Sequence, residues 1–171
     1  TKRYRLGVIS DTHLGSLYSQ KTHMQDFFET FKRESCDAVL HPGDLVHGSH
    51  HMHKGMEYEL GIHGARAQTA YAVEHIPDIG IPGYIISGNH DLSFRKDAGA
   101  EVVQDFADQR DDWTYLGDEG AMFEIGGAKV YMWHGGSGSY AKSYNLQKWA
   151  ESVAPENKPH VMLNGHLHFQ C

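Results

Sequence analysis

The sequence predicts an α/β fold in which two packed, mixed β-sheets lie between flanking helices, in the layer order α/β/β/α. Short apolar runs typical of buried strands alternate with helical patterns in the first half of the chain, and a glycine-linked hairpin follows in the second half. Five apolar runs also end in short polar groups. Because ligands bind at the carboxyl ends of strands in open α/β sheets, these groups predict a site at one sheet edge.

The size and composition predict one globular domain. The chain has 171 residues, of which 40% are hydrophobic and 22% charged. This length is enough for one domain with a sizeable core but too short for two domains of ordinary size. We expect residues 1–171 to form this single domain. The sequence stops three residues after His168, where a strand end would leave a sheet edge open, so we expect one or more C-terminal strands to be missing.

The charge pattern argues against several classes of partner. The net charge is −7, and the 15 Lys and Arg residues are scattered, which disfavours a broad surface for duplex DNA. No apolar stretch approaches the roughly 20 residues that cross a bilayer, and the first residues do not form a signal-peptide core. The two cysteines, Cys36 and Cys171, provide no disulfide framework. We therefore expect a cytoplasmic protein without a membrane partner, whose oligomeric state stays open.

The first half of the chain is expected to alternate strands and helices. Residues 5–9 read as a buried strand, and the next helix is expected to start with a capping box of Thr22 and Gln25. Its apolar stripe, which we assign to the core, contains Met24, Phe27, Phe28 and Phe31. The elements expected after it are a strand over 38–40, a helix over 56–76 that is weakest near Gly61 and Gly64, and a strand over 83–86.

The second half is expected to be mostly antiparallel strands with helices. The Gly126-Gly127 pair suits a hairpin turn with positive φ between strands over 122–125 and 129–133. The other expected elements are a helix over 100–107, a strand over 113–116, a helix with an apolar stripe from Leu146 to Val153, and a strand over 160–163.

The polar groups at the strand ends supply candidate metal ligands. They are Asp11 with His13, Asp44, Asn89 with His90 and Asp91, His134, and His166 with His168. One such group alone is more often a loop or a structural metal site, but their joint occurrence at the ends of apolar runs is not expected by chance. A mixed nitrogen and oxygen set suits Mn, Fe, Zn or Ni. If two ions are to lie about 3.5–4 Å apart, one carboxylate must be shared.

These motifs together resemble the calcineurin-like metallophosphoesterase superfamily. They are Asp11-x-His13, Gly43-Asp44, Gly88-Asn89-His90-Asp91, His134-Gly135 and Gly165-His166-x-His168, and they span most of the chain. The resemblance implies a dinuclear centre, for which we favour manganese. In it, Asp11, His13 and His168 would hold one ion, Asn89, His134 and His166 the other, and Asp44 would bridge them.

The resemblance also implies a reaction. A metal-bridging hydroxide would attack phosphorus in line, since two dications lower the pKa of bound water and polarise phosphoryl oxygens. His90 would not be a ligand; it would act as general acid for the leaving oxygen or stabilise charge on the phosphoryl group. Asp91 would orient the His90 ring.

The predicted function is metal-dependent phosphoester hydrolysis, more specifically phosphodiester hydrolysis. The opening Ser10-Asp-Thr-His-Leu-Gly15 most resembles the branch that contains DNA-repair exonucleases and related phosphodiesterases. This makes a nucleotide or nucleic-acid phosphodiester the leading substrate, and the acidic charge favours a small or single-stranded one. The alternatives are an exo- or endonuclease on DNA, a phosphomonoesterase, and a non-catalytic metal-binding scaffold.

The chain holds 14 histidines, more than the motifs use. We interpret one cluster as a solvated loop and helix face. The alternatives are a role in covering the site or contacting substrate, and an additional adventitious metal site. The members of this cluster are His47, His50, His51, His53 and His63. His41 precedes Gly43-Asp44 and either supports the site from behind or is simply packed.

Overall fold

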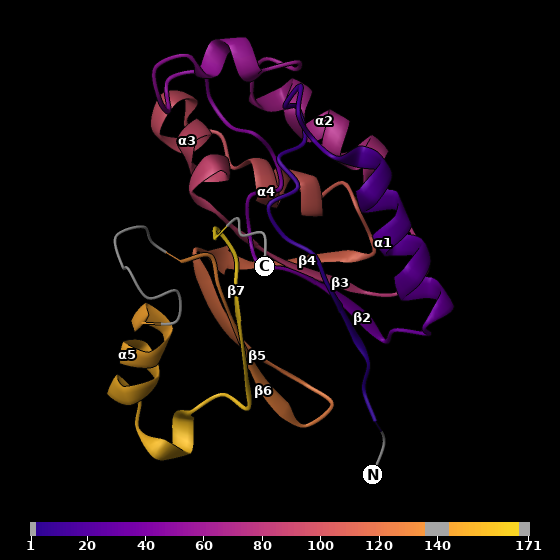
Figure 1. The fold of residues 1–171 in the computed structure, drawn as a ribbon, viewed down its shortest axis with the longest axis vertical. Coiled ribbons are helices and arrows are strands. Elements are labelled where there is room, and N and C mark those ends of the chain that lie inside the picture. The colour runs from indigo at the N-terminus through magenta and orange to yellow at the C-terminus, as the bar shows by residue number, and fades with distance from the viewer. Residues whose placement is uncertain (1–2, 136–143, 168–171) are drawn as a thin grey trace.

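The structure, a computed structural model, describes residues 3–135 and 144–167 and contains two β-sheets (Figure 1). The larger sheet has the order β1-β2-β3-β4, and all its pairs are parallel. Its strands are β1 Leu6–Val8, β2 Ala38–His41, β3 Gly83–Ser87 and β4 Trp113–Asp118. The smaller sheet has the order β5-β6-β7, with strands β5 Gly120–Ile125, β6 Ala128–Trp133 and β7 Val161–Asn164.

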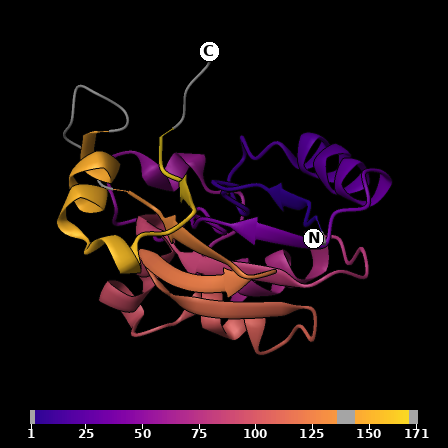
Figure 2. The same cartoon turned by 90° about the horizontal axis from the view of Figure 1, so that it is seen from below.

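Helices flank both sheets. They are α1 Lys21–Arg33, α2 Ala65–His75, α3 Asn89–Ala98, α4 Val102–Ala107 and α5 Tyr144–Ser152, with short 3-10 turns η1 Met56–Glu59 and η2 Pro155–Asn157. Figure 1 shows α1 to α4 on the side of the larger sheet and α5 beside the smaller one. Seen from below, α1 and α5 lie at opposite ends of the molecule (Figure 2). The predicted α/β class with two sheets and flanking helices is confirmed.

The larger sheet is buried on both faces because neighbouring apolar residues of its central strands point in opposite directions. Val39 and Ile85 belong to the core under the helices, together with Phe28 and Phe106. The second core, between the two sheets, consists of Leu40, Ile86, Val130 and Met132. Continuous apolar runs in β2 and β3 therefore place the larger sheet between the helices on one face and the smaller sheet on the other.

The hairpin was predicted correctly, but the prediction of two mixed sheets is correct only for the smaller sheet. β5 and β6 are antiparallel, and the turn residues Gly126 and Gly127 have φ of 60° and 80°, as such a turn requires. The larger sheet is parallel throughout, because α1, α2 and the α3–α4 pair provide crossovers between its strands. Only the smaller sheet is mixed, since β6 and β7 are parallel.

Three expectations about helices are wrong. The helix over 56–76 is divided into η1 and α2, and Gly64, with φ of 89°, precedes α2. Helix α3 begins directly at Asn89, where only a turn was expected. Helix α1 begins at Lys21 after Gln20 without a side-chain cap, so Thr22 and Gln25 lie inside the helix and form no capping box.

The apolar stripe of α1 is narrower than predicted. Met24, Phe28 and Phe31 are buried, but Phe27 is 52% exposed and therefore not a core residue. A helix in contact with a sheet buries only one face, and Phe27 lies at the edge of that face. No helix in the described ranges has the length and apolar character that a membrane span needs.

Candidate metal centre

The predicted ligands meet where strands of both sheets end. In the larger sheet, Asp11 and Asp44 follow β1 and β2, and Asn89 follows β3. In the smaller sheet, His134 follows β6 and His166 follows β7. Because β1, β2 and β3 are parallel, and β6 and β7 are parallel, each sheet carries its polar residues at one end.

Two groups of possible metal ligands share one carboxylate. Within each group, one ligand atom per residue lies within 4.8 Å of the others. The groups are Asp11, His13 and Asp44, and Asp44, His134 and His166. Asn89 adjoins the second group, with its Oδ1 3.0 Å from His134 Nε2. The structure thus brings six predicted ligands together, and the seventh, His168, lies outside the described residues.

Asp44 lies between the two groups. Its Oδ2 is 3.0 Å from His134 Nε2 and 3.8 Å from His13 Nε2. Its Oδ1 accepts a hydrogen bond of 2.9 Å from the backbone N–H of His90. One oxygen therefore faces imidazoles from both sheets, while the other fixes the carboxylate on the start of α3.

The backbone at this site has an unusual conformation. Outside glycine, positive φ is uncommon because Cβ crowds the backbone, and it persists where the surrounding structure enforces it. Four candidate ligands adopt it: Asp11 (φ 54°), His13 (43°), Asp44 (55°) and His166 (70°). In the part of the chain that the structure describes, only Ser35 and Glu119 join them among non-glycine residues. Local strain is therefore concentrated at the candidate ligands.

His134 is held from behind and enclosed by glycines. It is fully buried, and its Nδ1 donates to the Pro42 carbonyl at 2.7 Å, which leaves Nε2 directed at Asp44. A Cβ at Gly43 would lie 2.4 Å from His134 Nδ1, and one at Gly88 would lie 2.2 Å from Asp44 Oδ1. Both motif glycines thus permit a close approach that no other residue allows. Such a partner behind the ring orients a metal-binding histidine.

Asp44 and His134 stabilise each other in opposite charge states. Burial opposes ionisation of Asp44, but the hydrogen bond and charge of His134, with His90 and His13 nearby, lower its pKa to about 2. Burial also opposes protonation of His134, but Asp44 raises its pKa to about 9. In the absence of metal, the Asp44 carboxylate therefore stabilises a proton on His134 Nε2, at the position where it would otherwise stabilise a metal cation.

His90 and Asp91 have different surroundings from those expected. The Nδ1 of His90 donates to the His47 carbonyl at 2.6 Å, so this carbonyl, and not Asp91, orients the ring. Asp91 is buried, and its carboxylate accepts backbone N–H bonds from Val46 at 2.9 Å and Gly88 at 2.8 Å. Burial and the nearby Asp44 charge raise the pKa of Asp91 to about 7. The predicted orienting contact is wrong because Asp91 points into the protein and joins the loops after β2 and β3.

The sequence profile of the calcineurin-like phosphoesterase family matches residues 4–170. The chain belongs to this family. A search of curated proteins gave no match for this phosphoesterase.

Two solved structures have the same fold as this calcineurin-like phosphoesterase. A novel archaeal phosphodiesterase superposes with a TM-score of 0.59 at 17% identity, over 97% of this chain and 74% of that one. A protein of unknown function from Aquifex aeolicus superposes with a TM-score of 0.52 at 14% identity, over 98% of this chain and 81% of that one. At such identities the likeness concerns the fold.

One histidine that the sequence analysis placed on a solvated face lies at the candidate metal centre. His47 is buried, and its ring approaches His13 and His90 with one ligand atom of each residue within 4.8 Å. Its Nε2 also lies 3.4 Å from the Glu59 carboxylate. The spacing of three residues after Asp44 was the available signal. The other members of the predicted cluster are exposed: His50, His51, His53 and His63.

His41 supports the site from behind. It is fully buried, and its Nε2 lies 3.2 Å from the Thr12 hydroxyl. Burial lowers its pKa to about 4 against the opposing charges of Asp11 and Asp44, so the ring is neutral near pH 7. His41 is therefore a packed neighbour of the loop that carries Asp11 and His13.

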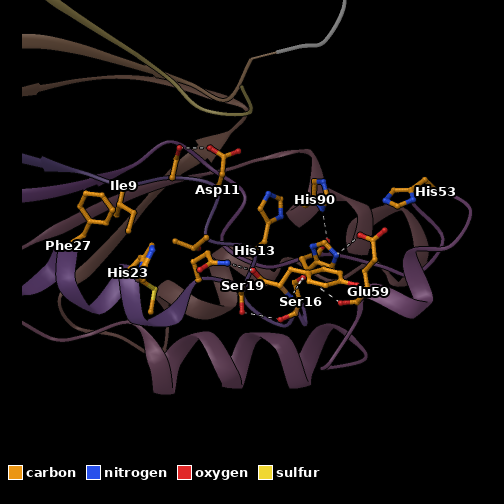
Figure 3. A pocket seen from close by; sticks show the side chains of 16 residues that line it. Ile9, Asp11, His13, Ser16, Ser19, His23, Phe27, His53, Glu59 and His90 are labelled. Carbon is orange, nitrogen blue, oxygen red and sulfur yellow. Dashed lines mark hydrogen bonds and ion pairs between the residues drawn. The ribbon is translucent and has the colours of Figure 1, made fainter. Parts of the chain in front are cut away.

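A cavity of about 470 Å³ opens beside the candidate ligands (Figure 3). Asp11 and His13 line its middle, and His90 lines one end. Its lining contains neither Lys nor Arg among the described residues. Positive charge for an anionic substrate would therefore have to come from bound cations and from histidines.

Proposed function

We propose that this protein is a phosphodiesterase that hydrolyses its substrate with two divalent metal ions, with manganese as the favoured ion. The observation that carries the proposal is the position of Asp44, which belongs to both groups of possible ligands. A carboxylate shared in this way is what two ions about 3.5–4 Å apart require. Family membership supports phosphoester hydrolysis in general.

The donor set fits such ions. Carboxylate and amide oxygens combine with imidazole nitrogens, a mixture that suits borderline divalent metals. Asp11 and His13 would hold one ion, and Asn89, His134 and His166 the other, with Asp44 between them. His168 would complete the first set, on the motif resemblance alone. The positive φ of Asp11, His13, Asp44 and His166 supports a functional role, since strained residues cluster at such sites.

When bound, the pair of ions would supply acidified water as nucleophile and polarise the phosphoryl oxygens for in-line attack. His90 would assist the leaving group. Its Nδ1 proton is fixed on the His47 carbonyl, so Nε2 is the atom that can give a proton to a leaving oxygen or stabilise phosphoryl charge. Asp91 would position the ligands, because its carboxylate joins the loop that carries Asp44 to Gly88, the residue before Asn89 at the start of α3.

The charge around the cavity favours a diester over a monoester. A phosphodiester carries one negative charge, whereas a monoester carries up to two and would gain from a cationic side chain near the metals. None of the described lining residues is Lys or Arg, and the whole chain has a net charge of −7. These features also disfavour long duplex DNA, which is held by many phosphate contacts. The structural neighbour described as an archaeal phosphodiesterase is consistent with this choice.

The test combines metal content with turnover. Metal-free protein is reloaded separately with Mn, Fe(II), Zn or Ni, and bound metal is measured by mass spectrometry. Turnover of bis(p-nitrophenyl) phosphate is then compared with that of p-nitrophenyl phosphate. We expect two ions per chain and faster hydrolysis of the diester. A single ion, or no turnover with any metal, would identify a scaffold or structural site instead.

A second panel defines the substrate class. It contains cyclic nucleotides, single-stranded DNA, duplex DNA and nucleoside monophosphates, all assayed with the best metal. We expect small or single-stranded phosphodiesters to be cleaved faster than duplex DNA. Preference for duplex DNA would favour the nuclease alternative, and preference for nucleoside monophosphates would favour a phosphomonoesterase.

A further inference from the structure

The cavity beside the metal centre has two chemically different ends (Figure 3). His90, Glu59 and His53 lie at one end, whereas Ile9 and Phe27 lie at the other, and the candidate ligands lie between them. A substrate whose phosphorus sits at the metals must therefore direct one ester group toward the histidines. The other ester group can reach the apolar end.

The apolar end presents an open aromatic surface. Phe27 is 52% exposed, although three other members of its helical stripe are buried. Its ring centroid lies 6.3 Å from that of Phe31, so the ring is supported from the core side while it lines the cavity. Ile9 adds apolar surface, and His23 adds a second flat ring with hydrogen-bonding nitrogens.

We propose, on the basis of the proposed phosphodiesterase function, that Phe27, Ile9 and His23 form a subsite for the base of a nucleotide phosphodiester. A base is flat and uncharged, so it gains from stacking on an aromatic ring and needs no cationic partner. This matches an end of the cavity that is apolar and whose described lining lacks Lys and Arg. Ser19 and Gln20, which also line the cavity, offer hydrogen bonds to base edges.

The same geometry assigns the bound nucleoside to one side of the scissile bond. His90, which would assist the leaving oxygen, lies toward the end opposite Phe27. The group near Phe27 is therefore the one that stays on phosphorus after hydrolysis. Water adds to phosphorus, the P–O bond to the leaving alcohol breaks, and the retained nucleoside monophosphate is the first product.

The experiment compares two esters with the same leaving group and charge. These are thymidine 5′-(p-nitrophenyl phosphate) and methyl p-nitrophenyl phosphate, so the ratio of their kcat/KM values isolates the contribution of the retained nucleoside. We expect Phe27→Ala to lower this ratio by about tenfold, mainly through KM, because one stacked base is lost. Phe27→Tyr should restore it. The matched control is Tyr58→Ala, since Tyr58 is an aromatic side chain, 83% exposed, outside the cavity lining.

The outcomes separate this inference from the proposed function. If the wild-type protein cleaves both esters and Phe27→Ala leaves their ratio at the wild-type value, the subsite is refuted while the phosphodiesterase stands. If neither ester is cleaved, the phosphodiesterase fails, and calorimetric binding to the metal-loaded protein decides the subsite. Thymidine 5′-monophosphate should then bind more tightly than methyl phosphate in wild type but not in Phe27→Ala. Equal binding of the two ligands by wild type would overturn it.

Discussion

The two sheets contribute to the candidate metal centre by different means. The larger sheet supplies Asp11, His13 and Asp44 from the loops after its strands and Asn89 from the first residue of α3, all of which rest on the core under the helices. Asp91 fixes two of these loops through buried hydrogen bonds to backbone N–H groups. This half of the site is therefore preorganised by the fold around it.

The smaller sheet is anchored less deeply. Its fully buried residues in the core between the sheets are Val130 and Met132, and α5 has no buried residue. Its other side chains in this core are only partly buried: Ala121, Phe123, Ile125 and Leu163. Its two candidate ligands are tied to the larger sheet by polar contacts: His134 meets Asp44 and Asn89, and the His166 N–H donates to Asp11 at 3.0 Å. Metals bound between these residues would also join the two sheets. We therefore expect metal binding to stabilise the smaller sheet more than the larger one.

The largest effect is expected for Asp44→Asn, since Asp44 joins both halves. Loss of the shared charge should release metal and lower turnover by more than about a hundredfold, because loss of even an outer-shell partner costs about 10–100-fold. Metal analysis and diesterase assays measure both effects. Two ions retained per chain in this variant would contradict the bridging role.

A substitution in the part of the candidate metal centre that the larger sheet supplies should separate metal binding from catalysis. His90→Ala removes the ring beside His13 but no proposed ligand, so both ions should remain while turnover falls by roughly a hundredfold. His53→Ala is the matched control, because His53 lines the same end of the cavity but is exposed and belongs to none of the motifs. Loss of metal from His90→Ala would make His90 a ligand and change the assignment.

Metal removal tests the comparison directly. At ion concentrations a hundred times the dissociation constant, binding stabilises the folded state by about 2.7 kcal/mol, and chelation should remove this amount. Amide exchange should then increase more in β6 and β7 than in β2 and β3, which belong to the larger core. Equal increases in both sheets would show that the smaller sheet does not depend on the metals.

Much of this arrangement could be predicted from the sequence because it rests on local patterns. Apolar runs located the strands, the Gly126-Gly127 pair located the hairpin, and polar residues directly after strands located Asp11, Asp44 and His134. In parallel strands, such positions converge by geometry. This geometry brings Asp11 and Asp44 together within one sheet, whereas the contact of His134 with Asp44 also depends on how the two sheets pack.

The errors concern neighbours that only the tertiary structure provides. Periodicity placed Phe27 on the apolar stripe of α1 but could not show that its side chain stays half exposed in the folded protein. The family resemblance implied that Asp91 orients the His90 ring, yet the Asp91 carboxylate accepts a hydrogen bond from the backbone of Val46, far away in sequence. The Glu59 carboxylate beside His47 comes from a segment expected to be a regular helix.

The smallest effect should appear in the pH dependence of metal binding. The raised pKa of His134, about 9, means that its proton stabilises the metal-free fold fully below pH 6.5 and that this stabilisation is lost as the pH rises through 9. A metal must displace this proton, so between pH 7 and 8.5 the affinity should rise by about tenfold per pH unit. In this window, histidines of ordinary pKa, about 6.5, are already neutral. Calorimetry in buffers of different ionisation enthalpy would count the released proton, and His134→Gln should remove this slope. A wild-type metal affinity that does not depend on pH would mean that His134 is neutral in the metal-free protein. The smaller sheet would then be as preorganised for metal binding as the larger sheet.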